Sequence, residues 1–192
     1  MNEEIKVRQY TNFNNDVYEY GPIGEEALCK HLIESNKHYI NVSKLTEFQT
    51  YDVDIIQIND DNVQSELYLD YFKNNISLKK LNAISYEVKT DTYGLKSRNI
   101  VWEVFSNSNN GCMSKSKADY LYYVFINNNK EVVEEYMINM KKIRWWLMSH
   151  FDKINQTSYL KSKSMRRGKD NTGILLINVD HLVNEKIAIK IK

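Results

Sequence analysis

The segment Ile84-Ser85-Tyr86-Glu87-Val88-Lys89 carries the information that decides how this chain folds. Successive side chains of a β-strand point to opposite faces of the sheet. The three apolar residues of the segment therefore share one face, whereas Glu87 and Lys89 share the other. A charged face on a strand that is otherwise suited to burial is costly unless a partner compensates it. We expect a metal ion beside Glu87 and an anion beside Lys89.

The context of this segment matters more than the tripeptide acid-x-Lys, which also occurs at Glu4-Ile5-Lys6. Upstream, a second strand is predicted over Tyr51 to Ile58, and its first residues place Asp52 and Asp54 on one face. Mg²⁺ prefers carboxylate oxygens and retains several waters. Two carboxylates from neighbouring strands, with Lys89 near the attacking water, form a plausible phosphodiester-cleaving centre. The alternative is an acidic strand end that faces solvent.

A helix predicted from Gly21-Pro22 to about Ser35 supplies a further carboxylate. Its apolar stripe consists of Leu28, Cys29, Leu32 and Ile33. Glu25 lies near the middle of that stripe, where a carboxylate is unusual unless it has a partner. The alternative is that Glu25 only complements the helix dipole in the first turn.

The rest of the chain alternates strand and helix patterns and predicts an α/β protein. Strands are expected over 84–90, 99–105, 120–126, 136–138, 173–179 and 186–192. A helix is expected where Ile143, Trp146, Leu147 and Phe151 recur at helical spacing, and Ser116 is expected to cap a short helical turn with Asp119. No repeat or flexible linker interrupts the 192 residues, so one domain is expected, with a core of about 21–126 and an extension of about 130–192.

The composition excludes a nucleic-acid-binding protein that is basic over its whole surface. The 26 basic and 25 acidic residues leave a net charge of +1, so any contact with DNA must come from a local patch. Such a patch is predicted in a basic loop, Lys161 to Gly168, with Lys163, Arg166, Arg167 and the following Lys169 as DNA-binding candidates. The alternative is an ordinary solvated surface. No apolar run is long enough for a membrane span, no signal peptide is evident, and the two cysteines favour a cytoplasmic protein.

The order of these motifs resembles the PD-(D/E)XK nuclease superfamily, in particular its small phage-type and resolvase-like branch. The matching residues are Gly24-Glu25, Tyr51-Asp52-Val53-Asp54-Ile55-Ile56, Tyr86-Glu87-Val88-Lys89-Thr90-Asp91, Asn99-Ile100-Val101-Trp102-Glu103, Gly111 and Ser116-Lys117-Ala118-Asp119-Tyr120. The similarity covers about 21–126 and, more loosely, the chain to Leu182. The proline of the family motif is absent, which leaves Asp52 and Asp54 as rival metal-binding residues, and the segment from there to Glu87 is longer than the usual hairpin.

The resemblance implies a restriction-endonuclease-like fold, with a central mixed β-sheet of four to five strands flanked by helices. It implies that Glu87 and Asp52 or Asp54 bind Mg²⁺ or Mn²⁺, that Lys89 orients or activates the water, and that Glu25 supports them. Glu103, the lone acid of its strand, is an accessory candidate whose alternative is a solvent-facing position. The implied partner is DNA, and a homodimer remains open. The implied location is the cytoplasm, that of the host cell if the chain is phage-encoded, as its many Asn and Lys residues suggest.

Two other functions compete with a metal-dependent DNA endonuclease. One is a catalytically inactive DNA-binding or protein-interaction module of the same fold, which would keep the basic segment. The other is an unrelated α/β interaction protein in which Glu87 and Lys89 are incidental. The arrangement of the acidic side chains discriminates between them, because the last alternative requires that Glu87, Lys89 and Asp52 or Asp54 do not converge within coordination reach.

Overall fold

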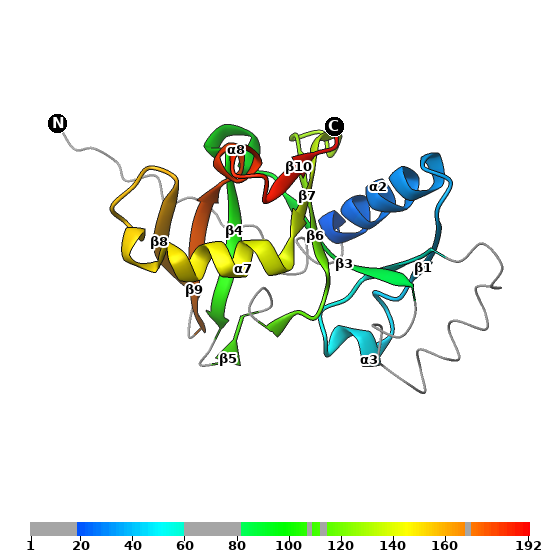
Figure 1. Ribbon diagram of the computed structural model, residues 1–192, viewed down its shortest axis with the longest axis horizontal. Coiled ribbons are helices and arrows are strands. Elements are labelled where there is room, and N and C mark those ends of the chain that lie inside the picture. The colour runs from blue at the N-terminus through cyan, green and yellow to red at the C-terminus, as the bar shows by residue number, and fades with distance from the viewer. Residues whose placement is uncertain (1–18, 60–81, 107–108, 112–114, 168–169) are drawn as a thin grey trace.

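A six-stranded mixed sheet forms one half of the molecule (Figure 1). The computed structural model describes residues 19–59, 82–106, 109–111, 115–167 and 170–192, of which 106, 109, 165–167, 170 and 171 are described by their backbone alone. The strand order is β1-β2-β3-β6-β7-β10, with β1 His38–Asn41, β2 Ile55–Ile58, β3 Ala83–Asp91, β6 Tyr120–Ile126, β7 Val132–Asn139 and β10 Ala188–Lys190. Only β3 and β6 are parallel. The α/β class with a mixed sheet flanked by helices is confirmed, but the sheet has six strands rather than four to five.

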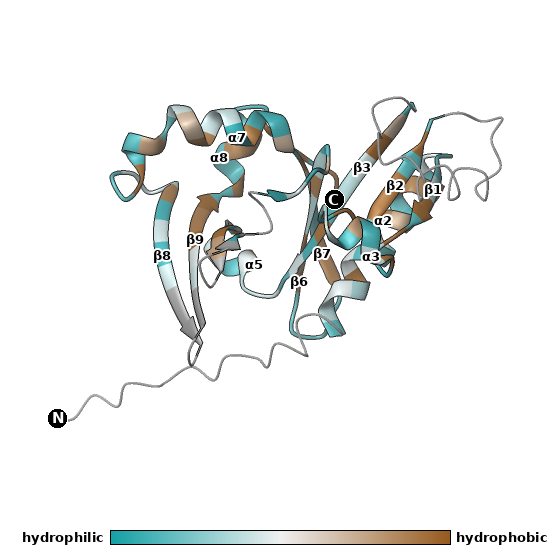
Figure 2. Cartoon of the chain, turned by 90° about the horizontal axis from the view of Figure 1, so that it is seen from below, coloured by the Kyte–Doolittle hydropathy of each residue, from teal (hydrophilic) through white to brown (hydrophobic). Residues whose placement is uncertain are grey.

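A second, antiparallel sheet packs beside the first. Its order is β5-β4-β9-β8, with β5 Asn109–Asn110, β4 Asn99–Ser106, β9 Asp170–Asn178 and β8 Leu160–Arg167. The predicted basic loop from Lys161 to Gly168 is therefore wrong, because most of it forms the edge strand β8. Figure 2 shows the reason: the polar described part of β8 lies beside the apolar β9, which supplies its hydrogen-bonding partner.

The helices lie at different parts of these sheets (Figure 1). They are α2 Gly21–Glu34, α3 Thr46–Gln49, α5 Gly94–Ser97, α7 Met140–Ser149 and α8 Val179–Asn184, with a 3₁₀ turn at Phe151–Lys153. The prediction of α2 is confirmed, and Leu28 and Leu32 are buried on it, although Ile33 is exposed. The helix around Trp146 is also confirmed, but Phe151 lies beyond its end and is exposed. Among the described residues, no helix is long and apolar enough to cross a membrane.

Strand β3 has a different environment on each face, as its alternation predicts. Tyr86 and Val88 pack with α2 in one apolar cluster, together with Leu28 and Leu32. On the opposite face, Glu87 lies beside Leu121 of β6, which belongs to the cluster beneath α7 and the second sheet. The same face of the neighbouring β2 belongs to a third cluster around Phe48 of α3, which contains Ile56 and Val53. The charged row of β3 therefore lies between two apolar clusters on one face of the sheet.

Candidate active site

Asp54 lies beside Glu87 at the point where the pairing of β2 with β3 ends. The predicted strand over 51–58 begins only at Ile55, which pairs with Tyr86 in antiparallel register. One residue earlier, the amide of Asp54 donates to the carbonyl of Tyr86 at 2.8 Å, which is one residue out of that register. Asp54 is therefore not the strand partner of Glu87. Its side chain instead bonds to the amide of Val88, the residue after Glu87, and its charge acts on the Glu87 carboxylate.

Glu87 is a buried carboxylate with a single neighbouring cation from its own strand. Its side chain is 3% exposed, and Oε1 lies 2.5 Å from Nζ of Lys89. Burial raises the pKa of Glu87 to about 8, with the Lys89 ammonium opposing this and the charges of Asp54 and Asp52 adding to it. Lys89 is 39% exposed, so its ammonium reaches solvent as well as Glu87. A further cation would stabilise the ionised form of a carboxyl group in such an environment.

Asp54 is held by the backbone of the strand that carries Glu87. Its Oδ2 accepts a hydrogen bond from the amide of Val88 at 2.8 Å. Burial raises the pKa of Asp54, against the effects of that hydrogen bond and of Lys89. Because the amide fixes one oxygen, the orientation of the carboxylate beside Glu87 is set before any ligand binds.

Asp52 occupies the turn before β2 rather than the strand predicted for it. Its backbone has φ of 47°, in the left-handed region that Asp and Asn tolerate better than most residues. Its Oδ1 lies 3.6 Å from Nζ of Lys115, whereas the buried Oδ2 has no hydrogen-bond partner among the described residues. Burial raises the pKa of Asp52, and Lys115 and Lys89 oppose that shift. Asp52, Asp54, Glu87 and Lys89 therefore converge, and we refer to them as the Glu87 cluster.

Lys115 was not among the residues selected from the sequence. It begins the segment 115–119, which packs on the turn of Asp52: Ser116 Oγ donates to the carbonyl of Asp52 at 2.9 Å, and the amide of Lys117 donates to that of Tyr51 at 2.8 Å. Ser116 does not cap a helix, because Oγ accepts from the amide of Ala118 in a turn. Nothing in the local pattern indicates these contacts, since they join segments that are far apart in the sequence.

Glu25 lies near the Glu87 cluster but is bonded to other residues. Its Oε2 accepts hydrogen bonds from Asn41 Nδ2 at 3.0 Å and Ser43 Oγ at 2.8 Å, at the end of β1. Its charge acts on Asp54, whose pKa it raises. The structure thus places Glu25 within electrostatic reach of Asp54, and it is half-buried rather than centred on the buried face of α2.

Glu103 and the basic candidates belong to the second sheet. Glu103 on β4 and Lys163 on β8 flank Ile174 of β9 in one row across that sheet. Lys163 is exposed, and the backbones of Arg166 and Arg167 belong to β8. Lys169 lies outside the described residues. Glu103 is thus in a different sheet from Glu87, and the DNA-binding candidates lie on a strand instead of a loop.

The donor set fits a magnesium ion only in part. Within the described part of the chain, no three His, Cys, Asp or Glu side chains lie close enough together to hold a metal by themselves. However, Mg²⁺ is commonly held by one or two carboxylates, several waters and the phosphates of a substrate. Asp54 and Glu87, with the unpartnered Oδ2 of Asp52 nearby, fit this second pattern. They therefore fit a metal that binds with substrate rather than a preformed cage.

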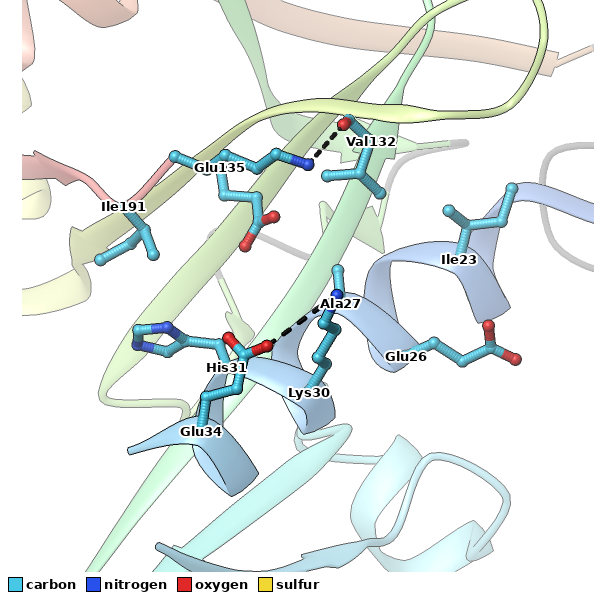
Figure 3. A pocket seen from close by; sticks show the side chains of 10 residues that line it. Ile23, Glu26, Ala27, Lys30, His31, Glu34, Val132, Glu135 and Ile191 are labelled. Atoms are coloured by element: carbon cyan, nitrogen blue, oxygen red, sulfur yellow. Dashed lines mark hydrogen bonds and ion pairs between the residues drawn. The ribbon is translucent and has the colours of Figure 1, made fainter. Parts of the chain in front are cut away.

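A cavity of about 510 Å³ lies on the other face of the sheet, between α2, β7 and the last residues of the chain. Figure 3 shows Glu135 and His31 projecting into it. Glu135 accepts a hydrogen bond from the hydroxyl of Tyr122, and burial and this bond raise the pKa of the phenol. No residue of the Glu87 cluster lines this cavity.

No family model, no curated protein and no solved structure matches this chain. The function is therefore inferred from the residues of the site and from the motifs in the sequence.

Proposed function

We propose that this protein is a metal-dependent endonuclease that hydrolyses phosphodiester bonds of DNA. The observation that carries the proposal is the proximity of Asp54, just before β2, to Glu87 on β3, with Lys89 2.5 Å from Glu87. These are the residues that the resemblance to the PD-(D/E)XK superfamily selects. Their position between two apolar clusters on one face of a mixed sheet supports a restriction-endonuclease-like fold.

Each residue of the Glu87 cluster has a role that follows from its position. Asp54 and Glu87 would hold Mg²⁺ or Mn²⁺, and the hydrogen bond from the amide of Val88 on β3 favours Asp54 over Asp52 as the upstream ligand. A metal bound there would polarise the phosphodiester and lower the pKa of a bound water. Lys89, partly exposed beside Glu87, would orient the attacking water and stabilise the charge that develops on the phosphate. Asp52 and Glu25 would act on Asp54 through their charges.

Contact with DNA requires cations outside the catalytic centre. Lys161 and Lys163 are exposed on the edge strand β8 and point to the same face of the second sheet, because they are two residues apart. Such lysines suit contacts with phosphates that carry no sequence information. The basic strand therefore supports DNA as the substrate without indicating a preferred sequence.

The direct test is nicking of supercoiled plasmid with and without Mg²⁺. Wild-type protein should nick only with the metal, and Glu87→Gln and Asp54→Asn should each lower the rate by roughly 10²-fold or more. Glu185→Gln is a matched control, because Glu185 is an exposed carboxylate at the end of α8, away from the Glu87 cluster. Nicking that needs no metal, or that persists in Glu87→Gln, would contradict the proposal.

One observation favours the alternative of an inactive DNA-binding module. The carboxylates of the described residues do not form a three-ligand metal group, and Lys89 already pairs with Glu87. In that case the protein binds DNA with or without Mg²⁺, and plasmid remains intact under all metal conditions. Binding without nicking therefore selects this alternative.

A further inference from the structure

The segment 115–119 is fastened to the structure at both ends. At its start, Ser116 and Lys117 bond to the backbone of Asp52 and Tyr51. At its end, Oδ2 of Asp119 accepts from the amide and the hydroxyl of Ser85 at 2.9 and 2.8 Å. The segment is therefore held against β3 and against the turn before β2, the two parts of the chain that carry the Glu87 cluster.

Helix α7 fixes the same segment from the other side. Nη2 of Arg144 donates to the carbonyl of Ser116 at 2.6 Å, and the amide of Met140 donates to the carbonyl of Asp119 at 3.0 Å. Ser116 is 2% exposed. Because its neighbour is anchored in this way, the backbone of Lys115 has a defined position beside Asp52.

Lys115 and Lys89 approach Asp52 from different segments. Nζ of Lys115 lies 3.6 Å from Oδ1 of Asp52, and its side chain is 48% exposed, compared with 39% for Lys89. Each lysine thus contacts one carboxylate of the cluster and still reaches solvent. An exposed ammonium at 3.6 Å from its partner can turn to a phosphate oxygen at little cost, because a pair of this kind is weak.

We propose that Lys115 is a second phosphate-contacting residue, which forms with Lys89 a clamp for the phosphodiester over the Glu87 cluster. This proposal rests on the proposed function, since it assigns a contact with the same substrate. It explains why an anchored segment presents a half-exposed lysine beside the carboxylate of Asp52, at the edge of the Glu87 cluster. Lys115 would bind a non-bridging oxygen of the phosphate, whereas Lys89 acts beside Glu87.

The test measures binding of a short DNA duplex against salt concentration, with Ca²⁺ in place of Mg²⁺ to limit cleavage, and then cleavage with Mg²⁺. Losing one phosphate contact should reduce the log–log salt slope by about 0.9. Lys115→Met should show this reduction and a roughly 10-fold or larger loss in kcat/KM, and Lys115→Arg should restore the slope. Lys117→Met is the matched control, because the exposed Lys117 uses only its backbone amide in the contact with Tyr51.

The outcomes separate this proposal from the function itself. If the salt slope of DNA binding is the same in Lys115→Met and Lys117→Met, Lys115 does not contact the phosphate, whatever the activity of the wild type. Wild-type binding without Mg²⁺-dependent cleavage, together with the reduced slope, overturns the nuclease and retains the phosphate contact. Failure of the wild type to bind DNA overturns both. If Lys115→Met melts at a lower temperature than wild type, the salt slopes with and without Lys115→Met are compared in an Asp52→Asn background. In that background, removing Lys115 leaves no carboxylate at position 52 without its cation.

Discussion

Two clusters of this protein each combine carboxylates with cations, but the pKa of their glutamate is shifted in opposite directions. The first is the Glu87 cluster. The second, the Arg98 cluster, joins the two sheets and consists of Arg98, Glu134, Tyr136, Asp180 and Lys190. Burial raises the pKa of Glu87 to about 8. Burial also acts on Glu134, but hydrogen bonds from Tyr136, Arg98 and Lys190 outweigh it and lower the pKa of that carboxyl to about 2.

The difference comes from how many opposite charges each cluster contains. In the Arg98 cluster two cations face two carboxylates: Arg98 lies 2.5 Å from Glu134 and 2.7 Å from Asp180, and Lys190 lies 3.1 Å from Glu134. The Glu87 cluster has three carboxylates and one lysine of its own. A cluster with balanced charges stabilises the fold, whereas one with an excess of buried carboxylates is suited to a cationic ligand. The comparison therefore indicates a structural role for the Arg98 cluster and supports the proposed metal-binding role of the Glu87 cluster.

The largest effect is expected from Lys89→Met, which removes a charge and keeps the packing of the stem. If Lys89 acts in the transition state, cleavage should fall by roughly 10²-fold or more, while DNA affinity and Tm remain close to wild type. Kinetics of plasmid nicking and a thermal melt measure this. Early melting would show that Lys89 is a structural partner of Glu87, and normal cleavage would remove it from the mechanism.

Arg98→Met should have the converse effect, on stability and not on the chemistry. Removing the guanidinium leaves Glu134 and Asp180 without their strongest partner, which should cost about 2 kcal/mol, between the values for exposed and buried pairs. For a chain of this size that lowers Tm by roughly 4–8 °C. Lys96→Met, on the neighbouring α5, is the control. An unchanged Tm would mean that the Arg98 cluster does not hold the sheets together.

Metal binding should distinguish the Glu87 cluster from the Arg98 cluster by a smaller effect, a shift in Tm. Mn²⁺ at about ten times its Kd should add about 1.4 kcal/mol of stability, or roughly 3–5 °C in Tm. The shift should disappear in Glu87→Gln and persist in Glu134→Gln, because the Glu87 cluster has more carboxylates than cations, whereas the Arg98 cluster has equal numbers. A wild-type melting curve that millimolar Mn²⁺ leaves unchanged argues strongly against a metal site.

The smallest effect concerns acid stability. Because the folded pKa of Glu134 is about 2 and its ordinary value is 4.5, its stabilisation is complete above about pH 4.5 and is lost as the pH falls toward 2. The free energy of unfolding in urea should therefore decline less between pH 5 and pH 3 in Glu134→Gln than in wild type. Glu131→Gln, in the turn before β7, should decline as wild type does. Equal declines in all three proteins would contradict the lowered pKa.

Local sequence determined the helices and strands in which the spacing of apolar residues matches the residues that are buried. The alternation in 84–89 placed Glu87 and Lys89 on one face of β3, and the apolar run of 120–126 gave the buried strand β6. Leu28 and Leu32 set the buried face of α2. These features depend on the two- and 3.6-residue periods, which operate within one segment. Glu87 was found in the same way, because it occupies a regular position in such a segment, whereas Asp52 and Asp54 precede the strand predicted for them.

Only the tertiary structure decided which segments meet. The left-handed turn at Asp52 precedes β2, which begins only at Ile55, and the amide of Val88 on β3 holds the carboxylate of Asp54 beside Glu87. Lys115 and Arg98 join their carboxylates across long stretches of chain, so no local spacing indicates them. The basic run after Leu160 is a strand because the apolar β9 satisfies its backbone hydrogen bonds while its lysines face solvent. Pairing between distant segments is a property of the whole chain, and composition within one segment does not encode it.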